Sequence, residues 1–170
     1  MRIPVLMRQF MLLLLSDRNS HYVHCRICLC TFLLGTLLLS GCGTSQKLEE
    51  LQNYRSEMDG FCSSVSSLQA QIDAIEPDSE NAQEELLSLL DQLAEASAEA
   101  AGFSTPEGYE EAGEMCRRAS DYLQEAKGEY HAAFEATPFD TESFQKGLDS
   151  YQSAGRCLSL MLENLQQPQN

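Results

Sequence analysis

The residues of this chain best able to do chemistry are its seven cysteines. A thiol or thiolate can bind a metal, form a disulfide or attack an electrophile. Three cysteines stand close together in a Cys-x-x-Cys-x-Cys pattern, one follows an apolar run, and three are widely spaced: Cys25, Cys28 and Cys30; Cys42; and Cys62, Cys116 and Cys157. The segments that carry them decide which of these reactions each one can serve.

The segment before Cys42 has the layout of a secretory signal. An apolar run of 13 residues, ICLCTFLLGTLLL, extends from Ile27 to Leu39, with Arg26 before it and small residues after it. A charged start, a short apolar centre and a small-residue cleavage site are typical of signal peptides. The run is too short for a permanent transmembrane helix, which needs about 20 residues. We therefore expect residues 1–41 to be a signal peptide.

The end of this segment, Leu39-Ser40-Gly41-Cys42, resembles the lipobox of bacterial lipoproteins. The resemblance covers residues 26 to about 43. It implies cleavage between Gly41 and Cys42, a diacylglycerol thioether on the Cys42 sulfur and usually an acylated new N-terminus. Two or three acyl chains such as palmitate give stable attachment. The resemblance thus implies a lipoprotein on the extracytoplasmic face of a bacterial cell membrane, or on the outer membrane if the cell has two, with residues 42–47 as lipidated Cys and tether.

This signal is longer than the usual 15–30 residues. Residues 1–22 could reflect a start site assigned too far upstream, with translation beginning at Val23. N-terminal sequencing of a cleavage-blocked precursor tests this hypothesis. Cys25, Cys28 and Cys30 lie in or beside the apolar run and leave with the signal, so we expect no metal site from their pattern.

The mature part, residues 42–170, contains seven basic and 25 acidic residues, a net charge of −18. Binding to nucleic acid needs clustered Lys and Arg, and so does purely electrostatic attachment to anionic lipid. The composition argues against both. The length suits a single domain. Most acidic residues fall at outward helix positions, a pattern that keeps helices soluble; a docking surface for a cationic partner is the alternative.

Composition and spacing after Cys42 predict an all-α fold. Val and Ile occur only at Val65, Ile72 and Ile75, whereas Ala, Leu, Glu, Gln and Ser, which favour helices, dominate. Apolar residues recur at alternating steps of three and four, the heptad period of packed helices. They predict helices over about 46–75, 80–101, 106–136 and 141–166. Because short loops join antiparallel neighbours, we expect an up-down-up-down four-helix bundle over residues 48–170.

Three of these helices have a regular predicted core seam. The seam positions are Leu51, Tyr54, Met58, Phe61, Val65, Leu68, Ile72 and Ile75 in the first helix; Tyr109, Ala112, Cys116, Ala119, Leu123, Ala126, Tyr130 and Ala133 in the third; and Phe144, Leu148, Tyr151, Gly155, Leu158, Leu162 and Leu165 in the fourth. The second helix is shorter and less regular. We expect it to leave the tether-side parts of its neighbours less covered.

Capping residues mark the predicted helix ends. The assignments are Asp78 or Asn81 before the second helix, with capping-box spacing from Asn81 to Glu84; Gly102 in a left-handed position after it; Thr105 as the cap of the third helix with Pro106 at its first position; and Asp140 as the cap of the fourth, with Phe139 packed on Phe144.

The junction of the last two helices resembles a tetratricopeptide repeat over about 30 residues. The matching residues are Ala126, Tyr130, Ala133, Pro138, Phe144, Tyr151 and Gly155. The resemblance implies a protein-interaction module. It fails at Leu160 and Asn164, which stand where small and aromatic residues belong, and one partial repeat cannot bury a solenoid face. A helix break at Gly155 would favour this alternative.

The spacing of Cys62, Cys116 and Cys157 from the predicted loops places all three near mid-height in the bundle. Cys157 lies on a helix adjacent to both of the others. One disulfide, Cys62–Cys157 or Cys116–Cys157, could therefore form outside the cytoplasm. The alternative is that all three are small buried side chains. Intact mass before and after reduction decides between the two.

No constellation of residues indicates catalysis. His131 is the only histidine after Cys42 and is expected at the surface or boundary of the bundle, and no phosphate loop, calcium loop or nucleophile elbow occurs. We expect a non-enzymatic module that binds or scaffolds a protein partner through its helix faces, with no cofactor beyond the lipid on Cys42. One alternative is a small-ligand or metal-binding bundle with an interior pocket lined by Tyr54, Tyr122, Tyr130 or Tyr151; the other is a tetratricopeptide-like interaction module.

Overall fold

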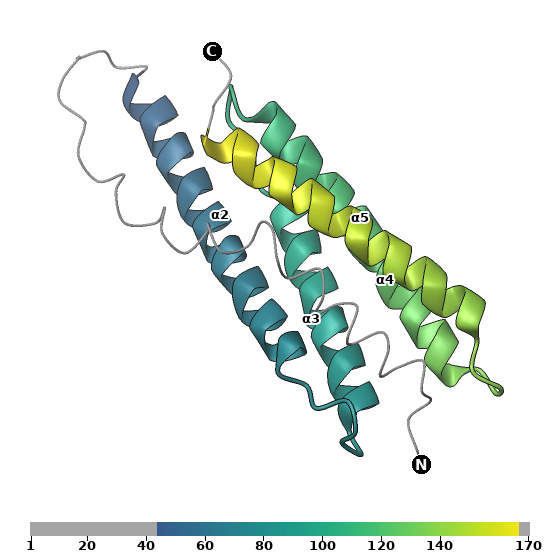
Figure 1. Ribbon diagram of the computed structural model, residues 1–170. Coiled ribbons are helices and arrows are strands. Elements are labelled where there is room, and N and C mark those ends of the chain that lie inside the picture. The colour runs from purple at the N-terminus through teal and green to yellow at the C-terminus, as the bar shows by residue number, and fades with distance from the viewer. Residues whose placement is uncertain (1–43, 167–170) are drawn as a thin grey trace.

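The computed structural model describes residues 44–166, which form four helices packed against one another (Figure 1). The helices are α2 (Thr44–Asp73), α3 (Ala82–Ala101), α4 (Glu110–Glu135) and α5 (Thr141–Gln166), and the described part contains no strand. Each helix runs antiparallel to the next. We call the end with the start of α2, the α3–α4 loop and the end of α5 the upper end, and the opposite end the lower end. The predicted four-helix bundle is confirmed.

The helix boundaries lie within two residues of the predicted ones, except at the start of α4. α5 has the predicted bounds, and α3 starts two residues late. α2 is already helical at Thr44, so residues 44–47, predicted as a tether, lie in its first turn. The signal peptide of residues 1–41 and the anchor residue Cys42 lie outside the described residues.

The start of α4 was wrongly predicted. Pro106 to Gly108 form a turn instead of a first helical turn: Gly108 has φ 90°, and the Tyr109 N–H donates to the Pro106 carbonyl at 3.1 Å. The helix begins at Glu110, whose carboxylate accepts the Gly108 N–H at 2.9 Å. A positive φ is cheap only for glycine, so Gly108 ends any helix that starts at Thr105.

Two other predicted caps are also wrong. Gly102 has φ −86° and stays in the right-handed region, with its N–H donating to the Glu99 carbonyl at 3.0 Å. Asn81 precedes α3 but its side chain makes no capping bond, so the predicted capping box with Glu84 is not formed. Asp78 lies three residues earlier, in the turn before that cap position.

The predicted cap of α5 is confirmed. The Asp140 Oδ1 accepts the N–H groups of Glu142 at 2.9 Å and Ser143 at 3.2 Å, and the Ser143 hydroxyl donates to Oδ2 at 3.1 Å. The Phe139 and Phe144 rings pack across the cap with centroids 5.5 Å apart. One carboxylate thereby accepts two of the four N–H groups that the start of a helix leaves without an intrahelical partner.

Replacing Asp140 by alanine is expected to lower the melting temperature at neutral pH. The hydrogen bonds from Ser143 hold the pKa of Asp140 below its usual value of 3.8. A carboxyl group with a lowered pKa in the folded state stabilises that state above its unfolded pKa and loses the effect as the pH falls. Melting curves of the wild type and Asp140→Ala should therefore differ at pH 7, begin to converge near about pH 4 and meet only below the lowered pKa of Asp140; a difference independent of pH contradicts the ionic cap.

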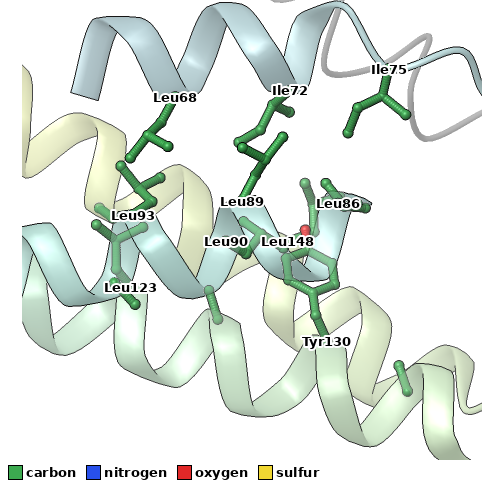
Figure 2. Close-up of a cluster of buried hydrophobic side chains, with 14 of the residues drawn as sticks. Leu68, Ile72, Ile75, Leu86, Leu89, Leu90, Leu93, Leu123, Tyr130 and Leu148 are labelled. Atoms are coloured by element: carbon green, nitrogen blue, oxygen red, sulfur yellow. The ribbon is translucent and has the colours of Figure 1, made fainter. Parts of the chain in front are cut away.

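The lower half of the bundle is filled by branched side chains from all four helices. Figure 2 shows Leu68 and Ile72 of α2, and Ile75 just after its end, directed at the leucines of α3, with Leu123 and Tyr130 of α4 and Leu148 of α5 completing the cluster. A second cluster fills the upper half. Its buried members are Tyr54, Met58, Phe61, Ala100, Tyr109, Ala112, Cys116 and Met161. Burial of this apolar surface is the main force that holds the bundle together.

The most extensive backbone contact is between α4 and α5. There the Tyr130 ring lies on Gly147: a Cβ at position 147 would stand 3.2–3.3 Å from three of its ring carbons. At Gly128, on the exposed side of α4, a Cβ would meet nothing within 4 Å. A side chain at position 147 would therefore force the Tyr130 ring to shift, and one at position 128 would not.

Two glycine substitutions should have opposite effects on stability. Gly147→Leu is expected to destabilise the fold by about 1–3 kcal/mol, because the new side chain must displace Tyr130. Gly128→Ala is expected to stabilise it by about 0.5–1 kcal/mol through helix propensity alone. Urea unfolding of both variants measures the difference. Equal shifts in the same direction would show that α4 and α5 do not meet at Gly147.

Candidate binding seam between α2 and α5

The face that α5 buries differs from the predicted one. The buried positions are Phe144, Gly147, Leu148, Ser150, Ala154, Cys157 and Met161, whereas the predicted seam residues Tyr151, Gly155, Leu158, Leu162 and Leu165 are only half-buried. From residue 150 onward the buried stripe is thus displaced by one position toward the N-terminus. α5 has turned its small residues toward the core and its leucines toward the edge.

The leucine edge of α5 borders α2. The Tyr151 hydroxyl lies 3.4 Å from the Gln69 Oε1 of α2, and Val65 and Cys62 are half-buried about one and two turns above Gln69. Since the two helices run antiparallel, Cys62 lies at about the height of Leu158. The half-buried side chains of α2 and those of α5 pack against the edges of the two core clusters.

We call this strip the α2–α5 seam and define it by Cys62, Val65, Gln69, Tyr151, Leu158, Leu162 and Leu165. The backbone approach of α2 to α5 is much sparser than that of any consecutive helix pair. A strip of partly exposed apolar side chains between two helices is the kind of groove that accepts the apolar face of a third helix. We expected such a strip beside the short helix α3, whereas these half-buried apolar side chains lie on α2 and α5.

The other cysteines are placed in the interior. Cys116 and Cys157 are buried free thiols, and burial raises the pKa of Cys116 to about 11. Neither Cys62–Cys157 nor Cys116–Cys157 is bonded in the structure, since both pairings need Cys157. A thiol with so high a pKa is a poor nucleophile, so Cys116 serves as a small apolar side chain in its cluster. Oxidation of the chain outside the cytoplasm stays a prediction that intact mass tests.

The four tyrosines proposed to line an interior pocket do not converge. Tyr54 belongs to the upper cluster and Tyr130 to the lower one, and both are almost completely buried. Burial raises the pKa of both phenols. Tyr122 is half-buried beside the lower cluster, and Tyr151 lies in the α2–α5 seam. These side chains fill the bundle as packing groups in separate places.

His131 lies at the boundary of the bundle, as predicted, and joins α4 to α3. Its Nε2 stands 2.9 Å from the Asp91 Oδ1, and the Lys127 Nζ stands 3.5 Å from the same oxygen. The side chains are about one third exposed, so this group contributes modestly to the α3–α4 contact. Asp91 was not singled out from the sequence, because nothing local in the sequence connects it to residues 36 and 40 positions later.

A surface hollow of about 570 Å³ opens at the lower end between α2 and α3. Its lining is mixed and partly acidic: Gln71, Ala74, Ile75, Asn81, Glu84, Glu85, Ser88 and Leu89. Within residues 44–166, no group of three or more His, Cys, Asp or Glu side chains is arranged to hold a metal ion. In the same range, no helix combines the length and apolar character needed to cross a membrane.

α5 continues without a break through Gly155. The helix break that would favour a tetratricopeptide repeat is therefore not found at this position. Gly41, Cys42 and the Cys25–Cys30 pattern lie outside the described residues, so their predicted roles rest on the sequence. No family model, curated protein or solved structure matches this chain.

Proposed function

We propose that this protein is a lipid-anchored, extracytoplasmic and non-enzymatic module that binds an amphipathic helix of a partner protein in the α2–α5 seam. The observation that carries the proposal is the half-buried leucine edge of α5. Leu158, Leu162 and Leu165 lie along one face at steps of four and three, the spacing at which a second helix packs. The anchor is inferred from the lipobox-like residues that end in Cys42.

Two properties of the chain support a helical partner with a basic polar face. The seam residues follow one another along two antiparallel helices, an arrangement that suits an extended helix better than a compact ligand. The mature part carries 25 acidic and only seven basic residues. A charge of this size steers an oppositely charged partner toward the bundle and repels acidic proteins.

Site-specific photocrosslinking in the native membrane tests this function. A photoreactive amino acid at Leu158 is expected to capture one discrete protein partner, because this side chain lies in the seam. The matched control is Leu87, which is also a half-buried leucine but lies on α3 beside the lower cluster. Capture from Leu87 and not from Leu158, or equal adducts from both, would contradict binding in the seam.

A further inference from the structure

One strongly exposed apolar side chain of the bundle lies close to its upper end. Between residues 44 and 166, the large apolar side chains that are strongly exposed are Leu48, at 48 %, and Leu160, at 47 %. Leu48 lies in the second turn of α2, and Leu160 lies six residues before the end of α5. Leu48 is thus at the upper end, whereas Leu160 lies about 18 Å below it, because Tyr151 is level with Gln69. All side chains from Gln46 to Glu50 are exposed, so the start of α2 has no neighbouring helix to cover it.

The same end carries the proposed anchor. α2 begins at Thr44, and only Gly43 separates it from Cys42. Two residues span at most about 7 Å even when extended, and the rise from Thr44 to Leu48 is about 6 Å. A lipid on Cys42 therefore keeps Leu48 within about 13 Å of the membrane interface. A tether that continues to residue 47 would have allowed the bundle to stand farther away.

Electrostatic attraction does not explain an apolar side chain at this place. The one nearby cation on α2, Lys47, is paired with Glu107 of the α3–α4 loop at 2.8 Å, and Glu49 and Glu50 flank Leu48. Such a surface gains nothing from anionic headgroups. The Leu48 side chain is the part of this surface that can interact favourably with a bilayer. Apolar side chains of membrane-bound helices lie about 5–10 Å deep, at the boundary of headgroups and acyl chains.

From these positions we propose that the upper end of the bundle rests directly on the phospholipid surface, with Leu48 in the headgroup layer. The inference rests on the lipid anchor of the proposed function. It adds a protein–lipid contact that fixes the orientation of the bundle. The α2–α5 seam then points away from the membrane, with its Leu165 end nearest to the bilayer.

A tryptophan reporter tests this contact, because the chain contains no tryptophan of its own. The full lipidated chain with Leu48→Trp is reconstituted into phosphatidylcholine vesicles whose acyl chains are either plain or brominated. Bromine quenches only indoles that are close to the acyl chains. The control is Ala132→Trp, at an exposed position near the lower end of α4. Both sites are exposed, so neither substitution disturbs the core.

We expect emission from Leu48→Trp to be weaker in brominated than in plain vesicles, and emission from Ala132→Trp to be equal in the two. Equal emission from Leu48→Trp in a chain that floats with the vesicles overturns the contact while leaving the anchor and the seam intact. That result is also expected if a second copy of the chain covers Leu48. A chain that does not float with the vesicles overturns the anchor itself, and the contact with it.

Discussion

Replacing Tyr130 by alanine is expected to destabilise the bundle by about 3–5 kcal/mol, the loss typical of a buried aromatic side chain. Tyr130 is 1 % exposed. Its ring lies flat on Gly147 of α5 and meets Phe144 edge-on with centroids 5.4 Å apart. Alanine would leave a cavity between α4 and α5 that Gly147 has no side chain to fill. The loss is large compared with the 5–15 kcal/mol that holds a typical domain folded.

Chemical unfolding of two further variants shows that the cost comes from the ring at this place. Tyr122→Ala removes the same side chain from the same helix, but Tyr122 is only half-buried, so its loss should be clearly smaller. Tyr130→Phe keeps the ring and should retain most of the stability. Equal losses for Tyr122→Ala and Tyr130→Ala would mean that the aromatic contact with Gly147 and Phe144 does not anchor α5 on α4.

The contrast between α4 and α5 shows how far apolar spacing predicts a core. All eight seam positions predicted for the third helix are buried: Tyr109 lies just before α4 and the other seven lie within it. They are buried because α4 packs against both α3 and α5. On α5 the predicted Phe144 and Leu148 are buried, but beyond them Ser150, Ala154, Cys157 and Met161 are buried one position before the predicted residues. Small residues let two backbones approach, and the dispersion contacts of that approach outweigh the burial of a few leucines.

Spacing of apolar residues therefore could not predict the α2–α5 seam. The sequence of α5 does contain an indication of the seam, because a stripe of small residues runs beside a stripe of leucines. Only one of these two faces can be fully buried in the bundle, so the other stays partly exposed. Tyr151 is informative as well. It was placed in the core by its spacing, but a phenol with a polar tip suits a boundary position such as that beside Gln69.

Caps were predictable where the interaction was local and unpredictable where distant residues decided it. Asp140 caps α5 through bonds to residues two and three positions away. Thr105 has the right type and spacing to cap α4, but its side chain instead packs against Gly113, where no Cβ could be accommodated. That contact forms only when the loop is folded over the upper cluster. It could not be predicted from the residues next to Thr105 in the sequence.

Replacing Cys42 by serine is expected to abolish lipid attachment, which is the largest functional effect of any single substitution in this chain. The lipobox-like sequence implies a thioether on this sulfur, and a serine hydroxyl is far less nucleophilic than a thiolate. Each buried methylene of an acyl chain contributes about 0.8 kcal/mol to membrane affinity, so that two chains hold a protein where one gives only marginal binding. Loss of the whole group should remove this affinity completely.

Metabolic labelling with palmitate and the size of the product measure the effect. Sedimentation with the membrane alone would not, because an uncleaved precursor can stay on the membrane through its apolar run. The Cys42→Ser chain should incorporate no label and keep residues 1–41. The matched control is Cys30→Ser, which removes a thiol from the apolar run but leaves Leu39 to Cys42 unchanged, and should be labelled and cleaved normally. Label on Cys42→Ser, or its loss from Cys30→Ser, would move the anchor to another cysteine. It would also remove the reason for Leu48 to lie near the bilayer, because only an anchor at Cys42 is this close to the start of α2.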